Sequence, residues 1–304
     1  MEHLASADAE IERVAALLKN RVSVPTHPVK SVVIQITKKL QHALFPGYFD
    51  DQPGSMDTRH HQCSLLEDIL SKLTGQIGFA LRHSPGHAES TRDEMEREAA
   101  DIALRFVSRL PIVKEYLESD IEAAYRGDPA AFSESEIIIS YPGIYASMVY
   151  RLAHELYLLS VPLIPRVMTE HAHSVTGIDI NPGATIGRYF FMDHGTGIVI
   201  GETTVIGEHV KIYQGVTLGA LSTRGGQKLR DKKRHPTLED EVTVYSGASI
   251  LGGDTVIGRG SVIGGNMFIT KSLPPNTRVS QKCHGPEYSA LGNDESEKPG
   301  GMEP

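Results

Sequence analysis

The sequence predicts an α+β protein in which a helical N-terminal part is followed by a parallel β-helix. The first observation is an aliphatic residue that returns every six positions, often with Gly after it. An α-helix places apolar residues about 3.6 positions apart and an ordinary strand alternates them, so a sustained period of six fits neither. It is typical of the stacked coils of a parallel β-helix. The residues that show this period are Ile200, Ile206, Ile212 and Leu218, and then Leu251, Ile257, Ile263 and Ile269.

The second observation is the composition of residues 1–165, which are dense in Ala, Leu, Glu and Lys and sparse in Gly. Apolar residues recur there at helical spacing. Ser90 or Thr91, followed by Glu94, indicates the capped start of a long helix. We therefore expect a helical domain over residues 1–165 that packs, positions other parts or forms oligomers. Its two clearest apolar stripes are Ile11, Val14, Ala15, Leu17 and Leu18, and Leu65, Leu66, Ile69, Leu70 and Leu73.

From Ile178 onward Gly becomes frequent and the aliphatic residues become largely Ile and Val. Each repeat is expected to form one short strand and a turn, and three repeats to close one triangular coil. A single coil cannot bury its own interior, so the stacking of coils makes the core. We expect this domain over residues 166–280. Pro274 and Pro275 end the repeats, and residues 281–304 are polar and Gly-rich enough to form a flexible tail.

The composition argues against several classes of protein. The chain has 304 residues and never runs apolar for the roughly 20 positions that a membrane helix requires. Its first residues carry early acids and lack the basic-then-apolar order of a secretory signal. The formal net charge of −8 disfavours nucleic-acid binding. Cys63 and Cys283 cannot form a disulfide framework and lack a metal-ligand spacing. We expect a cytoplasmic protein without membrane or nucleic-acid partners.

The period of six is first broken between Met192 and Ile200, where two extra residues are inserted. The insertion carries His194, whose neutral imidazole can act as a general base. The alternative is that His194 only forms a hydrogen bond across the bulge. Asp179 lies fifteen residues earlier, close to one coil of about eighteen. It can therefore lie near His194 and fix the tautomer of the ring. Alternatively, Asp179 only shapes the turn before Pro182.

A second, longer break runs from about Ala220 to Asp240 and carries Arg234 and His235 near its end. Arginine beside histidine can bind a substrate carboxylate, although an exposed loop end would carry the same residues. The break is strongly basic, which favours a phosphorylated cofactor; the alternative is a run of solvated charge. Its cations are Arg224, Lys228, Arg230, Lys232, Lys233 and Arg234, against the single acid Asp231.

Other motifs are less informative. His171 and His173 stand at alternate positions, but two imidazoles without a third placed ligand do not indicate a metal site, and we expect none. The sequence has no Walker motif, no GxSxG elbow and no dinucleotide fingerprint after a strand. Since no thiol lies among the repeats, any acyl transfer is expected to be direct.

Four segments together resemble the serine O-acetyltransferase family of the hexapeptide-repeat acyltransferase superfamily. They are SDIEAAYRGDPA, YPGIYASMVYRLAHELY, SVTGIDINPGATIGRYFFMDHGTGIVIGETTVIGEHVKIYQGVTLGA and KRHPT, and the match covers roughly residues 100–280. The repeats alone indicate only the superfamily. The motif DHGTGIVIGET, joined to a distant RHP and an upstream GDPA, narrows the resemblance to the serine enzymes.

The resemblance implies a left-handed β-helix, the known exception to right-handed crossovers. It implies a homotrimer, or a hexamer built from two trimers, with active sites between neighbouring prisms. The implied reaction transfers acetyl from acetyl-CoA to the hydroxyl of L-serine, giving O-acetyl-L-serine and CoA in the first step of cysteine biosynthesis. Family members are often inhibited by cysteine at the serine site.

The resemblance also implies roles for residues. His194, paired with Asp179, would be the base, and His235 would belong to the catalytic set. The charged ends of the amino acid would be held by Asp128, Asp193, Arg234 and His235. Small residues would line the groove for the pantetheine arm, because they let a cofactor approach the backbone. These are Gly219, Ala220, Ser246 and Gly247.

The chain departs from the family pattern in three places. Its second break is longer than the short Gly-rich loop of many relatives, and its repeats end in GGNMFITKSLPPNTRVSQ without a Gly-Val-Pro-Ala closing. It ends in Met302-Glu303-Pro304, whereas relatives that bind cysteine synthase insert a terminal Ile, so no tight complex is expected. The alternatives are another hydroxyl acceptor such as homoserine or a sugar, another acyl-CoA donor, a metal-dependent lyase, and a non-catalytic scaffold.

Overall fold

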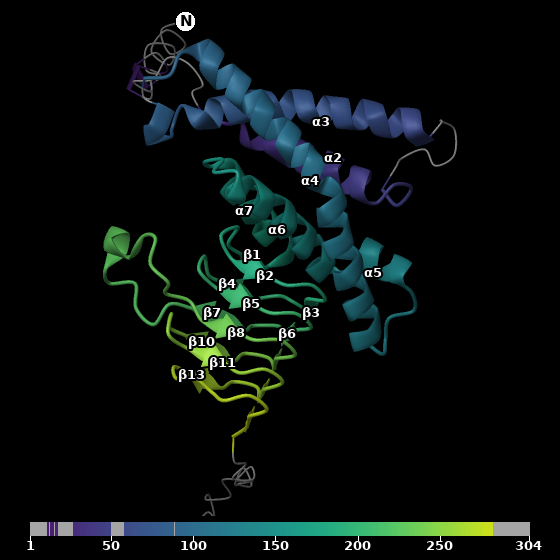
Figure 1. Cartoon of the computed structure of the whole chain (residues 1–304), viewed down its shortest axis with the longest axis vertical. Helices are drawn as coiled ribbons and strands as arrows, with labels where there is room; N and C mark the ends of the chain where they lie inside the picture. The colour runs from purple at the N-terminus through teal and green to yellow at the C-terminus, as the bar shows by residue number, and fades with distance from the viewer. Residues whose placement is uncertain are drawn as a thin grey trace, which may run out of the picture.

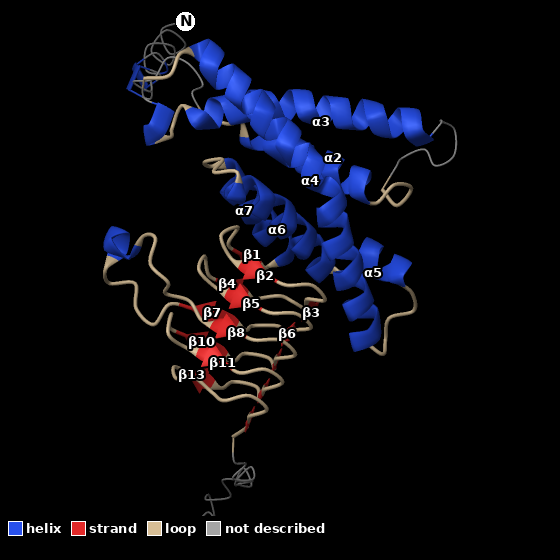
Figure 2. Cartoon of the chain, viewed as in Figure 1, coloured by secondary structure: helices blue, strands red, loops and turns tan. Residues whose placement is uncertain are grey.

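A computed structural model of the chain describes residues 11, 13–14, 16–17, 27–49, 58–87 and 89–281. A layer of helices covers one end of a stack of short strands, and the chain leaves the stack at the opposite end (Figure 1). In Figure 2 the helices gather in one part of the molecule and the strands in the other, apart from one helical turn on a loop that projects from the strands. None of the described helices has an apolar stretch of the length needed to cross a membrane.

The helical part continues past the boundary at residue 165 that the composition suggested, because the last helix ends at Thr176. Thr91 caps the longest helix: its hydroxyl accepts from the Glu94 N–H, and the Glu94 carboxylate accepts from the Thr91 N–H at 2.8 Å. This is the capping box expected from the sequence. The helices are α2 (Lys30–Leu44), α3 (Thr58–Leu81), η1 (Pro85–His87), α4 (Arg92–Gly127), α5 (Glu134–Ser140), α6 (Pro142–Leu158) and α7 (Ile164–Thr176).

The strands that follow are only two or three residues long. Before the long break they are β1 (Asp179–Ile180), β2 (Thr185–Ile186), β3 (Phe191–Asp193), β4 (Val199–Ile200), β5 (Val205–Ile206), β6 (Lys211–Tyr213) and β7 (Thr217–Gly219). After the helical turn η2 (Gly226–Leu229) they are β8 (Thr237–Leu238), β9 (Thr243–Val244), β10 (Ser249–Leu251), β11 (Val256–Ile257), β12 (Val262–Ile263), β13 (Phe268–Ile269) and β14 (Arg278–Val279).

Up to β13 every third strand joins the same sheet, and β14 then joins the third sheet beside β12, so the strands form the three faces of a prism. The first sheet has the order β1-β4-β7-β10-β13, the second β2-β5-β8-β11 and the third β3-β6-β9-β12-β14. All of these pairs are parallel; for example, Ile200 of β4 pairs with Leu218 of β7. The parallel β-helix expected from the period of six is therefore confirmed.

The aliphatic positions of the period form the interior of the prism. Ile200, Ile206, Ile212 and Leu218 are at most 2% exposed. One member of the expected register was wrong. Ile250, not Leu251, is fully buried, and Ile250 is the residue that pairs with Leu218. The chain absorbs the extra residue before Ile257 at Gly252, whose φ of +105° an L side chain rarely adopts.

A buried ion pair joins the helices to the first coil. Nε of Arg151 in α6 donates to Asp120 of α4 at 2.6 Å, and Nη2 donates to the Gly187 carbonyl at 2.8 Å. The Asp120 carboxylate also accepts from the Phe190 N–H at 3.0 Å. Because both charges are buried and hydrogen-bonded, loss of either partner would leave an uncompensated charge. The contact fixes the helices relative to the strands.

Some expectations fall on residues outside the described part of the chain. Ala15, Leu18, Cys283 and the proposed tail beyond residue 281 belong to this group. Ile11 and Leu17 of the first apolar stripe lie on helical turns and are 65% and 72% exposed, so they do not contribute to the core of this chain. In the second stripe, Ile69 and Leu73 are buried within the helical core as expected.

Candidate active site

The two-residue insertion forms a bulged corner between the third and first sheets. Asp193 ends β3, and the next residue, His194, has a φ of +58°, followed by Gly195 at +86° and Gly197 at +83°. The Gly197 N–H donates to the Gly177 carbonyl of the coil before it at 2.8 Å. Left-handed non-glycine residues also occur at other corners of this prism, for example His209 at +57°, so the inserted residues rather than the φ of His194 set this corner apart.

The imidazole of His194 projects from this corner toward solvent, with 72% of its side chain exposed. Its Nε2 lies 3.9 Å from the Asp193 carboxylate, and within the described residues the ring forms no hydrogen bond. The side chain therefore does not bond across the bulge, which was the alternative raised from the sequence. Its ring remains available to a substrate.

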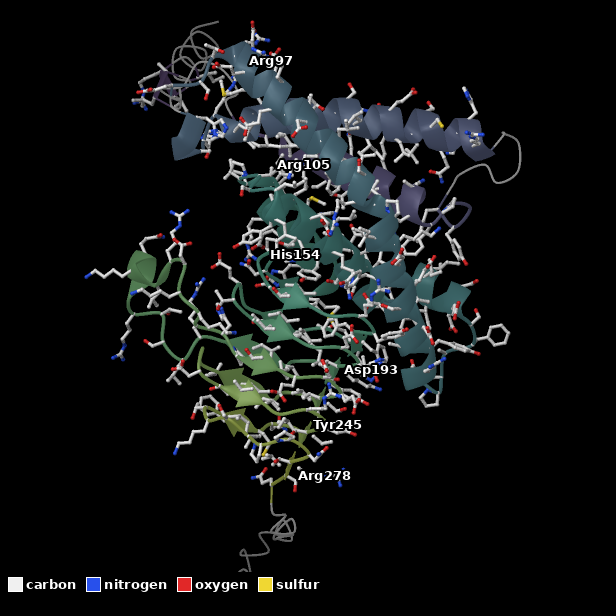
Figure 3. The ribbon with its side chains drawn as sticks, in the orientation of Figure 1. Arg97, Arg105, His154, Asp193, Tyr245 and Arg278 are labelled. Carbon is white, nitrogen blue, oxygen red and sulfur yellow. The ribbon has the colours of Figure 1, made fainter. Side chains whose placement is uncertain are left out.

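Asp193 itself is largely covered, with 14% of its side chain exposed. The ammonium of Lys211, on the neighbouring strand β6, lies 3.3 Å from its Oδ2. In Figure 3, Asp193 lies on the side of the prism that faces the end of α4, with Tyr245 on the coils beyond it. Lys211 was not among the residues singled out from the sequence.

Asp128 follows the last residue of α4 and approaches the same corner from the helical part. Its Oδ2 accepts from the Tyr141 hydroxyl at 2.6 Å, and its Oδ1 accepts from the Ala130 N–H at 2.8 Å. The bond from Tyr141 is the main reason that the pKa of Asp128 lies below its usual value, and the charges of Lys211 and His194 lower that pKa further. The structure thus brings Asp128 and Asp193 to one locality beside His194.

Arg234 and His235 lie at a different corner, between the first and second sheets, where the long break returns to the prism. The Arg234 guanidinium pairs with Glu202. His235 is 7% exposed, and its Nδ1 accepts from the Thr203 N–H at 3.0 Å. Burial, and then the charge of Arg234, lowers the pKa of His235 to about 4. Within one chain, the first sheet therefore lies between His194 and the corner of Arg234 and His235.

The His235 ring fits against the turn after β4 because that turn carries glycine. A Cβ on Gly201 would lie 2.1 Å from the ring, a distance too short for any real side chain, so only glycine fits at this position. Since Nδ1 of His235 accepts two hydrogen bonds from Thr203, the proton of the neutral ring sits on Nε2. His235 is therefore held as a neutral hydrogen-bond donor.

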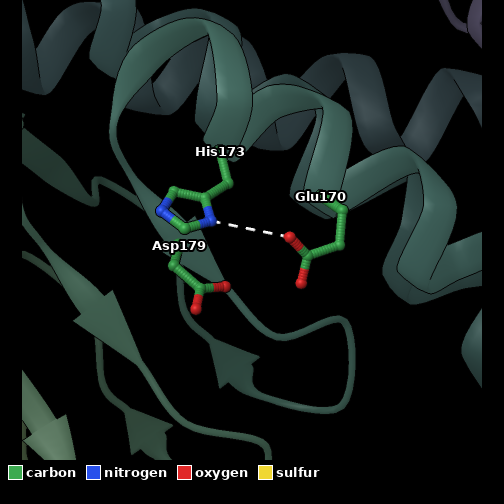
Figure 4. A group of neighbouring side chains, drawn as sticks. All are labelled: Glu170, His173 and Asp179. Atoms are coloured by element: carbon green, nitrogen blue, oxygen red, sulfur yellow. Dashed lines mark ion pairs between the residues drawn. The ribbon is translucent and has the colours of Figure 1, made fainter.

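Asp179, at the start of β1, lies beside Glu170 and His173 of α7 (Figure 4). Arg166 Nη1 lies 3.4 Å from Asp179 Oδ1, and Arg166 Nη2 lies 2.5 Å from Glu170 Oε1. Among the described residues no hydrogen bond joins Asp179 to His194, and the partner of this carboxylate is Arg166. The pairing of Asp179 with His194 stays a prediction.

Glu170, His173 and Asp179 each offer one ligand atom, and these atoms lie within 4.8 Å of one another. Figure 4 shows the ion pair between His173 and Glu170, at 3.6 Å. Because the Arg166 guanidinium already lies against both carboxylates, we interpret the group as an ion-pair network. Only His173 of the two histidines noted in the sequence belongs to it. That the chain needs no metal stays a prediction.

The four small residues expected beside a cofactor fall into two places. Gly219 and Ala220 are half-buried at the end of β7, whereas Ser246 and Gly247 precede β10. Thr217 of β7 pairs with Ser249 of β10. Gly219 and Ala220 therefore lie at the carboxyl ends of the strands of the first sheet, whereas Ser246 and Gly247 lie at their amino ends. Within one chain they do not line a single groove.

The comparisons with known proteins agree with this architecture. No protein-family model matches the chain. A plasmid-encoded serine acetyltransferase of Synechococcus elongatus is 46% identical over 249 residues, which are 80% of this chain and 78% of that protein. The chain belongs to the serine acetyltransferase family. The resemblance found in the sequence is confirmed, together with the expected class of enzyme, an acyltransferase.

Further members of the serine acetyltransferase family match over different lengths. The enzyme of Bacillus subtilis is 45% identical over 132 residues, 43% of this chain and 58% of that protein. Isoform 3 of Entamoeba histolytica, solved in complex with cysteine, has a TM-score of 0.71 at 36% identity and covers 84% of both chains. The Neisseria gonorrhoeae enzyme, solved in complex with serine, has a TM-score of 0.54 at 26% identity, covering 88% of this chain and 100% of that chain. The fold of the family, a left-handed β-helix after a helical N-terminal part, is the fold of this chain.

Proposed function

We propose that the chain transfers acetyl from acetyl-CoA to the hydroxyl of L-serine, with His194 as the general base. The observation that supports this most directly is the exposed imidazole on the inserted corner, with Asp193 and Asp128 beside it. Two carboxylates at one corner suit a substrate that carries an ammonium group. The name shared by the relatives and the serine bound in the Neisseria gonorrhoeae structure support the same acceptor.

The chemical step needs a base because a serine hydroxyl is a weak nucleophile. The His194 ring takes the hydroxyl proton while the serine oxygen forms a bond to the thioester carbonyl carbon. The resulting oxyanion collapses, the carbon–sulfur bond breaks, and the CoA thiolate takes the proton back from the imidazolium. General-base catalysis of this kind contributes about 10²- to 10⁴-fold in rate. No thiol of the chain has to carry the acetyl group.

Asp179 is proposed to orient the His194 ring once its carboxylate is released from Arg166. Such a carboxylate would stabilise the imidazolium that forms during the transfer. In the isolated chain Arg166 binds this carboxylate at 3.4 Å and is itself 44% exposed. A rearrangement of one exposed arginine side chain would therefore free it.

The carboxylate of the substrate requires a cation, and Lys211, the cation at His194's own corner, already lies against Asp193. We propose that Arg234 and His235 of a second copy bind this carboxylate across the interface of a homotrimer, alone or paired into a hexamer. A cyclic trimer places one corner of each prism against a different corner of the next. Nε2–H of the neutral His235 and the Arg234 guanidinium would then both donate to the substrate carboxylate. Arg234 would exchange its bond to Glu202 for the substrate.

The same interface provides a groove for acetyl-CoA. Gly219 and Ala220 of one copy would face Ser246 and Gly247 of the next, which joins the two places that one chain keeps apart. The long break projects from the prism beside this edge (Figure 1) and encloses a pocket of about 310 Å³ lined by Thr223, Gln227, Arg230 and Arg234, among others. The exposed cations of the long break suit the phosphates of CoA.

One further proposal concerns inhibition. Cysteine is expected to compete with serine, which the cysteine complexes of the Entamoeba histolytica enzymes support.

The test follows release of free thiol from acetyl-CoA with serine, homoserine and sugars as acceptors. Thiol release with serine is the expected result, and none with any acceptor would overturn the proposal. His194→Asn is expected to lower turnover by about 10²- to 10⁴-fold. His209→Asn is the matched control, since His209 is also exposed and has a φ of +57° on another corner. Equal turnover in both variants would remove His194 from the mechanism.

A further inference from the structure

Lys211 is the cation that the mechanism has not used. It begins β6, faces outward from the prism and keeps 22% of its side chain exposed. Its Nζ donates to the Gly127 carbonyl, at the last residue of α4, at 2.8 Å. The same atom lies 3.3 Å from Asp193 Oδ2. One ammonium thus contacts both the helical part and the β-helix.

Aromatic rings hold the Lys211 side chain in this position. Nζ lies 4.6 Å from the centroid of the Phe191 ring and 4.7 Å from that of Tyr213, distances at which a cation is attracted to a ring face. Burial alone would lower the pKa of Lys211, but hydrogen bonds with Tyr213 and Asp193 outweigh it and raise that pKa. The group is therefore a fixed, charged ammonium.

Gly127 allows the close approach that this contact requires. A Cβ on Gly127 would lie 2.8 Å from the Phe191 ring, so a larger residue would push the end of α4 away from β3. Asp128 is the next residue along the chain, and its pKa is lowered in part by the charge of Lys211. The position of the Gly127 carbonyl therefore also sets the position of Asp128.

We propose that Lys211 is a positioning residue that fixes the distance between Asp193 and Asp128, and so determines the affinity for the ammonium group of the acceptor. The inference rests on the proposed function. Without Lys211, the corner would carry the two negative charges of Asp193 and Asp128 with no cation against them. With it, the corner carries one net negative charge, which matches one substrate ammonium.

Lys211 acts through Asp193 rather than on the substrate. Its ammonium donates to the Gly127 carbonyl and lies 3.3 Å from Asp193 Oδ2, so these two contacts direct it toward the chain. The cation that binds the substrate carboxylate is therefore proposed to be Arg234.

The test is the change in KM for each substrate in Lys211→Met. We expect KM for serine to rise about ten- to hundredfold, because a hydrogen-bonded charge is lost, while KM for acetyl-CoA stays unchanged. Lys211→Arg, which keeps the charge, is expected to recover part of the serine affinity. Lys39→Met is the matched control, since Lys39 is partly buried against Asp68 between α2 and α3, far along the chain from this corner. It is expected to leave both KM values unchanged.

A double-mutant cycle with Asp193→Asn tests the route of the effect. If Lys211 acts through Asp193, the double variant binds serine no more weakly than Asp193→Asn alone. Additive losses would overturn this route, and an unchanged KM for serine in Lys211→Met would overturn the proposal itself. If Lys211→Met does not fold, Lys211→Gln takes its place, because an amide can still donate to the Gly127 carbonyl. Failure of the wild-type chain to acetylate serine would instead refute the proposed function, so the two failures are distinguishable.

Discussion

Thr203 fixes the ring of His235 from two directions, since both its backbone N–H, at 3.0 Å, and its hydroxyl, at 2.9 Å, lie within hydrogen-bonding distance of Nδ1. The Thr203 hydroxyl also accepts from the backbone N–H groups of Arg234 and His235, at 2.9 and 3.0 Å. A single side chain therefore anchors the end of the long break to the turn after β4.

The first prediction concerns the stability that this buried ring contributes. The pKa of His235 is lowered to about 4, whereas an unfolded histidine titrates near 6.5. Between these values the unfolded chain binds more protons, so the free energy of unfolding should rise with pH from about 4 to about 6.5 and change little above. Urea unfolding at a series of pH values measures this slope. His235→Asn is expected to reduce it, and an identical slope in that variant would contradict the assignment.

The second prediction concerns the hydrogen bond between Tyr141 and Asp128. Tyr141→Phe removes the main cause of the lowered pKa of Asp128, so that pKa should rise. We expect KM for serine to increase about tenfold, since a hydrogen bond to a charged group is lost. The acid limb of kcat/KM for serine should also move to higher pH. The control is Tyr145→Phe. Tyr145 lies in the first turns of α6, which Tyr141 precedes, and burial alone raises the pKa of Tyr145. Equal behaviour of the two variants would argue against the role of Tyr141.

The third prediction tests whether the active site is shared between chains. His194→Asn and Arg234→Ala are each expected to be inactive alone. Co-expressed in equal amounts, they should regain about a quarter of the wild-type activity, because that fraction of interfaces in a random cyclic trimer pairs an intact His194 with an intact Arg234. Sites formed within single chains would give no recovery. Light scattering of the same samples measures the number of chains.

The fourth prediction concerns the exposed cations of the long break. Lys233 donates to three backbone carbonyls, and Arg234 is the residue proposed to bind the substrate carboxylate, so neither is assigned to the phosphates of CoA. The remaining cations are exposed and are Arg224, Lys228, Arg230 and Lys232. Changing these four to Gln should raise KM for acetyl-CoA about tenfold at low salt, with the difference shrinking as salt is added. Acetyl-dephospho-CoA is the control substrate, and an equal rise with it would exclude contact with the 3′-phosphate.

Much of the fold could be predicted because its determinants are periodic or local. Ile200, Ile206 and Ile212 repeat at the spacing of the coils, and each is buried as that spacing requires. The capping box of Thr91 and Glu94 depends on four consecutive residues. The predicted register was wrong at Leu251, where Gly252 takes up one extra residue. Ile250 and Leu251 are adjacent aliphatic residues, and the period of six could place either of them in the interior.

The site was harder to predict because its contacts cross between distant segments. The interruption of the period located Asp193 and His194, but Lys211 occupies an ordinary outward position, and its contact with Gly127 spans 84 residues. Thr203 resembles any other turn residue until His235 is placed against it. The expected contact of Asp179 depends on whether Arg166, on a helix, reaches the first strand, and no pattern in the sequence carries that information.

The corner that carries His194 lies on the first coil, directly beneath the helices that Arg151 joins to it. In a linear array each unit is stabilised by its nearest neighbours, so fraying begins at an uncapped terminus and moves inward. Among the described residues, no element covers the coil that ends in β14, at the far end from His194. Thermal opening of the last coils should therefore precede the loss of the corner, and hydrogen exchange should be slowest in the coil that carries His194.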